Sequence, residues 1–141
     1  GRWTAGQVVR FHTAHKLQLM AHSTAAYRDL GRRVAKVKEL PRTEFRADYI
    51  QDFMSSLSRM ATPGRNTNVL QHAAGYFKKQ LPSAQRIELS DLIHDYRVGL
   101  VPIVVPLTLI RHYSSLYDVA YLEGQFFLEP HPRELMLRNH V

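Results

Sequence analysis

Apolar residues that recur three or four positions apart restrict this chain to helical folds. The clearest case is the segment 62–81, whose apolar stripe consists of Leu70, Ala73, Ala74, Phe77 and Leu81. A repeat of this period places such a stripe on one side of an α-helix, where it can be buried. The turn signal Pro63-Gly64 precedes three residues that favour helix N-caps, Asn66, Thr67 and Asn68. The segment is therefore predicted to be a loop that leads into a central helix.

The same spacing predicts helices at residues 4–22, 24–37, 41–60 and 83–98, and shorter ones at 118–128 and 133–139. The segment 100–110 is rich in β-branched residues, but its two prolines fit a central strand badly. We expect a buried helix there that begins near Pro102 or Pro106 and ends near Tyr117. A chain of 141 residues is long enough for one domain with its own core. We predict an all-α fold, a compact single-domain bundle of about six to seven helices over residues 1–141.

Positive charge exceeds negative charge, with a formal net charge of +7. A basic balance of this size indicates a polyanionic partner, nucleic acid first and an anionic membrane second. Residues 53–87 contain no acid and include five cations, Arg59, Arg65, Lys78, Lys79 and Arg86. The longest uncharged apolar run, 98–110, is shorter than the ~20 residues of a membrane span, and no signal peptide is visible. We expect no membrane partner and a cytoplasmic location.

The start of the predicted central helix has the chemistry of a phosphate site. A helix N-terminus offers unpaired N–H groups and partial positive charge, and Arg65, expected in the preceding loop, can bind a phosphate with two donors. Gly75, expected in the middle of the helix, would allow a partner's backbone to approach closely. The alternative is a solvated basic surface with a tolerated glycine. The candidate nucleic-acid-binding residues here are Arg65, Asn66, Asn68, Gln71, His72, Lys78 and Lys79.

Other donors lie outside this segment. Further candidates for RNA contact are Lys16, Arg111, Arg138 and His140, and weaker ones are His12, His15 and His131. His12 and His15 are three residues apart, but a metal site would need a third ligand, so buried and hydrogen-bonded histidines are the preferred interpretation. The residues after 129 either contact RNA or dock Leu135, Met136 and Leu137 onto the bundle.

The chain offers no recognisable reaction centre. It contains no cysteine, which excludes disulfides, thiolate catalysis and any cysteine-held zinc or iron–sulfur site within it. It also lacks a Walker loop, a dinucleotide fingerprint and a serine-elbow motif. The sequence therefore indicates a binding surface, with no catalytic residue and no metal site in this chain.

Four groups of motifs resemble a known family. They are Phe11-His12-Thr13-Ala14-His15-Lys16-Leu17 with Ala21-His22-Ser23; Gly64-Arg65-Asn66-Thr67-Asn68-Val69-Leu70-Gln71-His72 with Gly75-Tyr76-Phe77-Lys78-Lys79; Asp95-Tyr96-Arg97 with Gly99-Leu100-Val101-Pro102 and Val105-Pro106-Leu107-Thr108-Leu109; and Tyr121-Leu122 through Leu128-Glu129-Pro130-His131-Pro132 to Arg138-Asn139-His140-Val141. Over nearly its whole length the chain resembles the YbgA-like domain family.

That domain occurs alone or fused behind a cysteine-rich iron–sulfur desulfurase domain. The fused form resembles RudS-type desulfidases, which convert 4-thiouridine in tRNA back to uridine. The resemblance implies that the YbgA-like half binds tRNA, that the iron–sulfur cluster belongs to the other domain and that this domain needs no cofactor. Because the chain begins without methionine, we expect a domain cut from a longer fusion, with the stand-alone form as the alternative.

Three functions remain to be compared. The first is an RNA-binding domain that positions tRNA for a fused or associated desulfidase domain acting on 4-thiouridine. The second is a stand-alone histidine-dependent enzyme on a nucleotide or phosphorylated small molecule, which requires convergence of His12, His15, His72 or His112. The third is a scaffold that docks another protein. We predict the first, and we expect no enzymatic activity from this domain alone.

Overall fold

The computed structural model describes residues 4–39 and 42–129, and within these ranges every regular element is a helix. The α-helices are α1 (Ala5–Ala14), α2 (Lys16–His22), α3 (Thr24–Ala35), α4 (Arg42–Leu57), α5 (Pro63–Ala74), α6 (Ser83–Arg97), α7 (Val104–Leu116) and α8 (Ala120–Glu123). There are also three 3₁₀ helices in these ranges, η1 (Val37–Glu39), η2 (Lys78–Gln80) and η3 (Phe126–Leu128). The all-α prediction is confirmed. None of the helices described is long and apolar enough to cross a bilayer.

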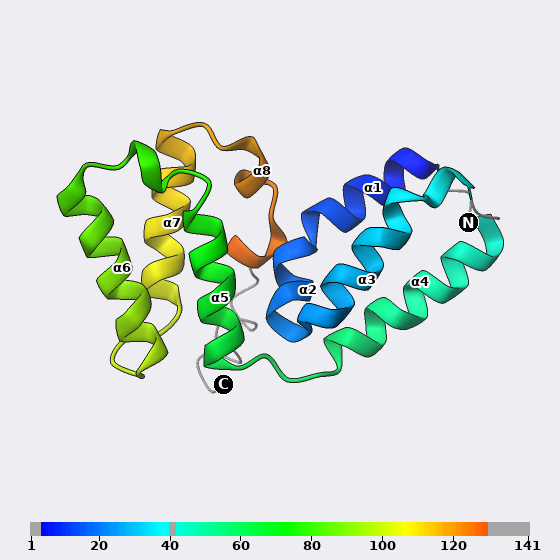
Figure 1. Cartoon of the computed structure of the whole chain (residues 1–141), viewed down its shortest axis with the longest axis horizontal. Coiled ribbons are helices and arrows are strands. Elements are labelled where there is room, and N and C mark those ends of the chain that lie inside the picture. Colours follow the sequence, from blue (N-terminus) through cyan, green and yellow to red (C-terminus); the bar gives the residue numbers. More distant parts are fainter. Residues whose placement is uncertain (1–3, 40–41, 130–141) are drawn as a thin grey trace.

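The helices form two lobes that lie side by side (Figure 1). The smaller core joins α1, α3 and α4 around Leu30 and Phe53, and the larger core joins α5 to α8 around Phe77 and Ile110. Helix α2 lies between them. Its Leu17 and Ala21 enter the larger core and its Leu19 enters the smaller one, because positions two apart point about 200° apart on a helix.

The single helix predicted at residues 4–22 is in fact two helices that break at His15. The break leaves backbone groups without helical partners, and a buried side chain from far along the chain bonds them. Gln125 accepts the N–H of Leu17 at 3.2 Å and donates to the carbonyl oxygen of Thr13. The bend between α1 and α2 thus depends on a residue that follows α8.

A serine cap and a glycine mark two other helix ends. Ser23 caps α3 by accepting the N–H of Ala26 at 3.2 Å. Gly99 ends α6 with φ of +86°, a left-handed conformation that favours glycine. The N–H of Gly99 donates to the carbonyl oxygen of Tyr96 at 3.0 Å. The next N–H, of Leu100, donates to the carbonyl oxygen of Asp95 at 2.8 Å. The proline-rich segment that follows forms the predicted helix, α7.

The helix predicted at residues 41–60 corresponds to α4, which ends at Leu57. Phe45, Tyr49 and Phe53 are buried in the smaller core, whereas Met60 lies beyond the helix and is exposed. One helix predicted at 118–128 is instead α8 followed by η3. The helix predicted at 133–139 lies outside the described residues.

Candidate nucleic-acid interface

Helix α5 begins earlier than predicted, at Pro63, with Thr62 as its N-cap. The hydroxyl oxygen of Thr62 accepts the N–H of Arg65 at 3.1 Å, and its carbonyl accepts the N–H of Asn66 at 2.8 Å. Pro63 has no N–H to offer. Because so few amides of this first turn are left for an anion, a phosphate site at this terminus is not supported.

Two predicted contact residues lie in that first turn and take part in internal bonding. Arg65 belongs to the helix rather than to the preceding loop, and its Nη1 donates to the carbonyl oxygen of Met60 at 3.0 Å. Asn66 has no exposed surface, and its amide donates to the hydroxyl of Tyr96 at 3.0 Å, which links α5 to α6. Asn66 therefore cannot contact RNA from this position, whereas Asn68 is exposed.

The far end of α5 also differs from the prediction, because the helix stops at Ala74. The N–H of Gly75 donates to the carbonyls of Gln71 and His72 at 3.1 and 3.2 Å. A Cβ on Gly75 would lie 3.2 Å from the carbonyl oxygen of His72, so its close contact is within the chain. The 12 residues of α5 separate its first turn from η2 by about 18 Å. Arg65 and Lys79 therefore do not form one common cradle.

A hollow between α5 and α6 brings other predicted residues together. The α5–α6 hollow has a volume of about 490 Å³, and its polar lining residues are Gln71, Lys78, Arg86 and Ser90. Leu81, Leu89 and Ile93 form part of its apolar wall, and no acid lines it. Exposed cations around a concave, acid-free surface suit a phosphate group. Arg86 is one of the five cations of the acid-free segment, but it was not among the predicted contact residues, because it belongs to the next helix.

Aromatic side chains lie at the same end of α5. Tyr76 stacks on Tyr121 of α8, with ring centroids 4.9 Å apart and planes 26° apart. His72 meets Tyr76 edge-on at 5.7 Å. His72 is exposed, as are Lys78 and Lys79. The structure therefore places four of the predicted residues, Gln71, His72, Lys78 and Lys79, close to the C-terminal end of α5.

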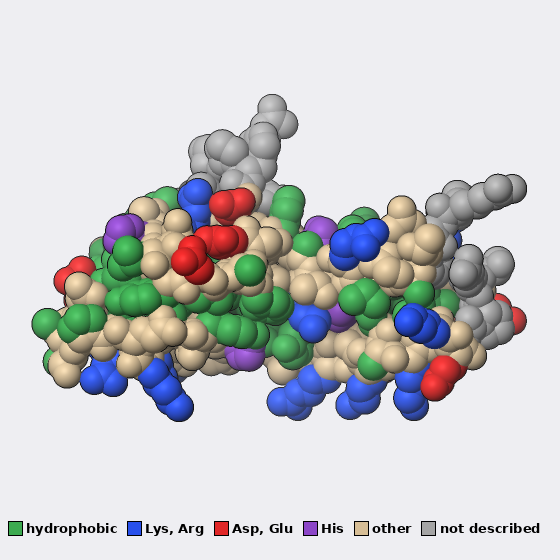
Figure 2. Space-filling model, turned by 90° about the horizontal axis from the view of Figure 1, so that it is seen from above, with side chains coloured by type: hydrophobic (Ala, Val, Ile, Leu, Met, Phe, Trp, Pro, Cys, Tyr) green, Lys and Arg blue, Asp and Glu red, His purple; other side chains and the backbone are tan. Residues whose placement is uncertain are grey.

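A second basic feature follows helix α3. Arg28, Arg32 and Lys36 are exposed and four residues apart, so they lie along one side of the helix. Arg33 points elsewhere and pairs with Asp29 at 2.7 Å and with Asp52 of α4. Figure 2 shows Lys and Arg side chains gathered along one long edge of the molecule, over both lobes. None of these three residues was among the predicted contact residues, although their four-residue spacing is visible in the sequence.

The remaining predicted contacts are dispersed. Lys16 is half-buried at the start of α2, between the lobes. Arg111 lies on α7, 3.7 Å from the carboxylate of Glu129, in a hollow that Glu123 also lines. This acidic setting suits an anion poorly. His131, Arg138 and His140 lie outside the described residues.

The N-terminal histidines are hydrogen-bonded, as predicted, but His12 is buried whereas His15 is only partly buried. His12 is buried, with its Nδ1 2.9 Å from the Tyr49 hydroxyl, and burial lowers its pKa from 6.5 to about 4. His15 stacks on Phe11 at 4.3 Å, and its Nδ1 lies 2.8 Å from the carbonyl oxygen of the same residue. The Nδ1 of His22 lies 2.6 Å from the carbonyl oxygen of Arg59. These three histidines therefore have structural roles, because each makes a hydrogen bond within the protein.

The histidines required by the enzyme hypothesis do not converge. His12 bonds Tyr49, His72 contacts Tyr76, and His112 on α7 contacts Tyr113. Among residues 4–39 and 42–129, no three His, Asp or Glu side chains are grouped so that they could hold a metal ion. Both observations count against a histidine-dependent enzyme.

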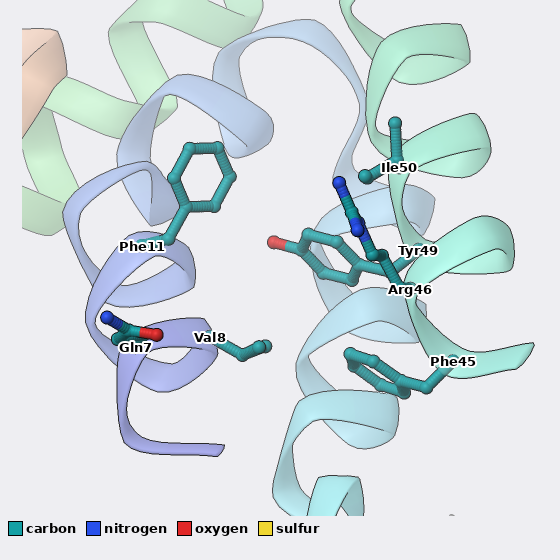
Figure 3. A pocket seen from close by; sticks show the side chains of 7 residues that line it. All are labelled: Gln7, Val8, Phe11, Phe45, Arg46, Tyr49 and Ile50. Atoms are coloured by element: carbon teal, nitrogen blue, oxygen red, sulfur yellow. The ribbon is translucent and has the colours of Figure 1, made fainter. Parts of the chain in front are cut away.

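An apolar groove between α1 and α4 was not predicted. Figure 3 shows Val8 and Phe11 on one side, with Phe45 and Tyr49 facing them from α4. Its volume is about 390 Å³, and Gln7, Arg46 and Ile50 complete its lining. Such a surface suits an apolar group better than a phosphate backbone. It was missed because its two walls are 37 residues apart in sequence.

Comparison with known proteins gives a family and a relative. A family described as "Protein of unknown function (DUF1722)" matches residues 16–132. The "Uncharacterized protein YbgA" of Escherichia coli (strain K12) is 39% identical over 137 residues, which cover 96% of this chain and 81% of that protein. No solved structure gives a significant match.

Proposed function

The chain belongs to the DUF1722 family, and we propose that it binds structured RNA, with tRNA as the principal ligand, through the α5–α6 hollow and the exposed cations of α3. The observation that carries this proposal is the α5–α6 hollow. Lys78 and Arg86 reach it from η2 and α6, and none of the residues that line it is acidic.

The chemistry of folded RNA matches this surface. RNA presents a dense row of phosphates, and exposed Lys and Arg side chains bind them with a strong dependence on salt. Arg28, Arg32 and Lys36 add exposed cations on the other lobe. Figure 2 shows Lys and Arg side chains along one long edge over both lobes, which exceeds what a single phosphate group would occupy. A polyanion of the size of tRNA accounts for a basic surface of this extent better than a small metabolite does.

The resemblance to the YbgA-like domains of desulfidases suggests a specific purpose for RNA binding. In this proposal the domain holds tRNA while a fused or associated domain removes sulfur from 4-thiouridine in the cytoplasm. The iron–sulfur cluster would belong to that other domain, because this chain has no cysteine to hold it. The residues of this chain would then bind and orient the tRNA, and the reacting groups would come from the other domain.

The direct test is a titration of the domain with tRNA at 50 and 200 mM salt, with Lys78→Ala/Arg86→Ala as the decisive variant. We expect wild-type affinity to fall steeply with salt. We expect the double variant to bind about tenfold more weakly, with a log–log salt slope lower by about two, because two phosphate contacts are lost.

A control variant removes the same charge elsewhere. Lys38→Ala/Arg111→Ala changes one exposed cation on each lobe, and neither side chain lines the hollow. Binding by this control should remain within about twofold of wild type. Equal losses of tRNA affinity in the two double variants would mean that the attraction is non-specific and that the hollow is not the binding site. Absence of tRNA binding at low salt would reject the proposal.

A further inference from the structure

Tyr76 is a large aromatic residue that the fold leaves on the surface. Its side chain is 45% exposed, although the next residue, Phe77, is almost fully buried in the larger core. Tyr76 therefore does not owe its position to core packing alone. An exposed aromatic ring is unremarkable by itself, so the inference depends on how this ring is held and on what lies near it.

Neighbouring groups restrict the ring of Tyr76. It stacks on Tyr121 at 4.9 Å, and His72 meets it edge-on at 5.7 Å. Its backbone N–H donates to the carbonyl oxygen of Ala73 at 3.2 Å, and the buried Phe77 anchors the following residue. A ring that is already ordered loses little conformational entropy when a second planar group stacks on it.

The restricted ring is close to a residue of the proposed phosphate site, because the two residues of chain from Tyr76 to Lys78 span at most about 7 Å. Gln71 lines the α5–α6 hollow, and the residue after it, His72, touches Tyr76. Lys78, which also lines the hollow, follows Tyr76 by two residues. An aromatic platform beside a cationic hollow is the combination by which proteins bind single-stranded nucleic acid, with bases on the rings and phosphates in the groove.

We propose that Tyr76 is a stacking platform for an unpaired base of the bound RNA, whose neighbouring phosphates occupy the α5–α6 hollow. The inference rests on the proposed function and narrows its ligand to RNA with an unpaired loop or end. Inside an uninterrupted duplex each base face already stacks on its neighbours, so only the terminal pairs could offer a face to Tyr76. The ring tolerates different bases, because every base has a π-face.

The test uses a single-stranded RNA dodecamer with one 2-aminopurine, whose fluorescence is quenched by stacking on an aromatic ring. The wild-type domain and Tyr76→Phe should both quench it. Tyr76→Leu should quench little and bind the dodecamer roughly tenfold more weakly, the loss expected when one stacked base is removed. Its salt slope should match wild type, since no cation has changed. Binding of a long blunt RNA duplex, in which nearly every base is internal, should be the same for all three proteins.

The second variant set separates this inference from the proposed function. Lys78→Ala/Arg86→Ala should lower the salt slope and yet quench the probe at saturation. If Tyr76→Leu binds and quenches like wild type, the stacking inference is wrong while RNA binding stands. If the wild-type domain binds neither dodecamer nor tRNA, both proposals fail.

A measurement on the unmodified protein avoids any effect of substitution on folding. Base stacking should shift the ring-proton NMR signals of Tyr76 upfield when the dodecamer is added, because of the ring current of the base. Absence of such a shift at saturation would overturn the inference even if Tyr76→Leu failed to fold.

Discussion

His12 should make this protein sensitive to mild acid. The side chain is buried, and a hydrogen bond joins its Nδ1 to the hydroxyl of Tyr49. Its Nε2 is also buried and has no hydrogen-bond partner among the described residues. A proton there would be desolvated and unpaired. Desolvation, assisted by the positive charges of Lys16 and His15, lowers the pKa of His12 from 6.5 to about 4.

The size of the effect follows from the two pKa values. Because the pKa of His12 is lower in the folded protein, the unfolded chain binds its proton first as the pH falls, and the free energy of unfolding decreases. A pKa of 6.5 in the unfolded chain and about 4 in the folded protein corresponds to a loss of about 2 kcal/mol between pH 7 and pH 5. The loss continues toward about 3 kcal/mol near pH 4.

The assay is urea unfolding at pH 7, 6 and 5, followed by circular dichroism, for wild type and His12→Asn. The asparagine amide offers Tyr49 a hydrogen-bonding group near the position of Nδ1 and does not titrate. The variant should be less stable at pH 7, because it leaves a cavity, but the difference should shrink by about 2 kcal/mol by pH 5. Other titrating groups are common to both proteins and cancel. Two stability curves that stay parallel over this range would refute the reasoning.

Three further substitutions test the fold. Gln125→Ala removes the partners of two buried backbone groups at the α1–α2 break, so thermal unfolding should show a loss of roughly 3 kcal/mol; a loss below 1 kcal/mol would mean that water replaces the amide. Gly99→Ala should cost about 1 kcal/mol in urea unfolding through backbone strain alone, because a Cβ there meets nothing within 4 Å; unchanged stability would contradict that strain. Tyr96→Phe takes from the buried Asn66 amide its hydroxyl partner and should cost about 1–3 kcal/mol by calorimetry, and equal melting temperatures would show that the bond contributes nothing.

The central segment shows why helix boundaries were harder to predict than helices. Pro63 at the first helical position and Thr62 as N-cap are favourable start signals, and they compete with the later candidates at Asn66 and Asn68. The earlier start extends the buried side of the helix by one turn. Asn66 then falls four residues before Leu70, on the same side, and is buried. Extending the apolar stripe backwards by one turn would have identified it as a core residue.

The candidate interface was partly predictable. The absence of acids between residues 53 and 87 marks the segment as a basic surface, since charge is a property of the sequence. Lys78 and Arg86 line the same hollow only because of the way α6 packs against α5. The stack of Tyr76 on Tyr121 joins residues 45 positions apart, and no local pattern records it.

Local periodicity, prolines and caps were enough to determine that this chain is helical, and its composition was enough to determine that it is basic and free of cysteine. The tertiary structure alone decided where helix 4–22 breaks, which polar residues are buried and which cations share a hollow. The physical reason is that each of these features joins groups distant in sequence, as when Gln125 bonds Thr13 and Leu17. The Gln125 bonds form only when the segment after α8 packs against α1 and α2.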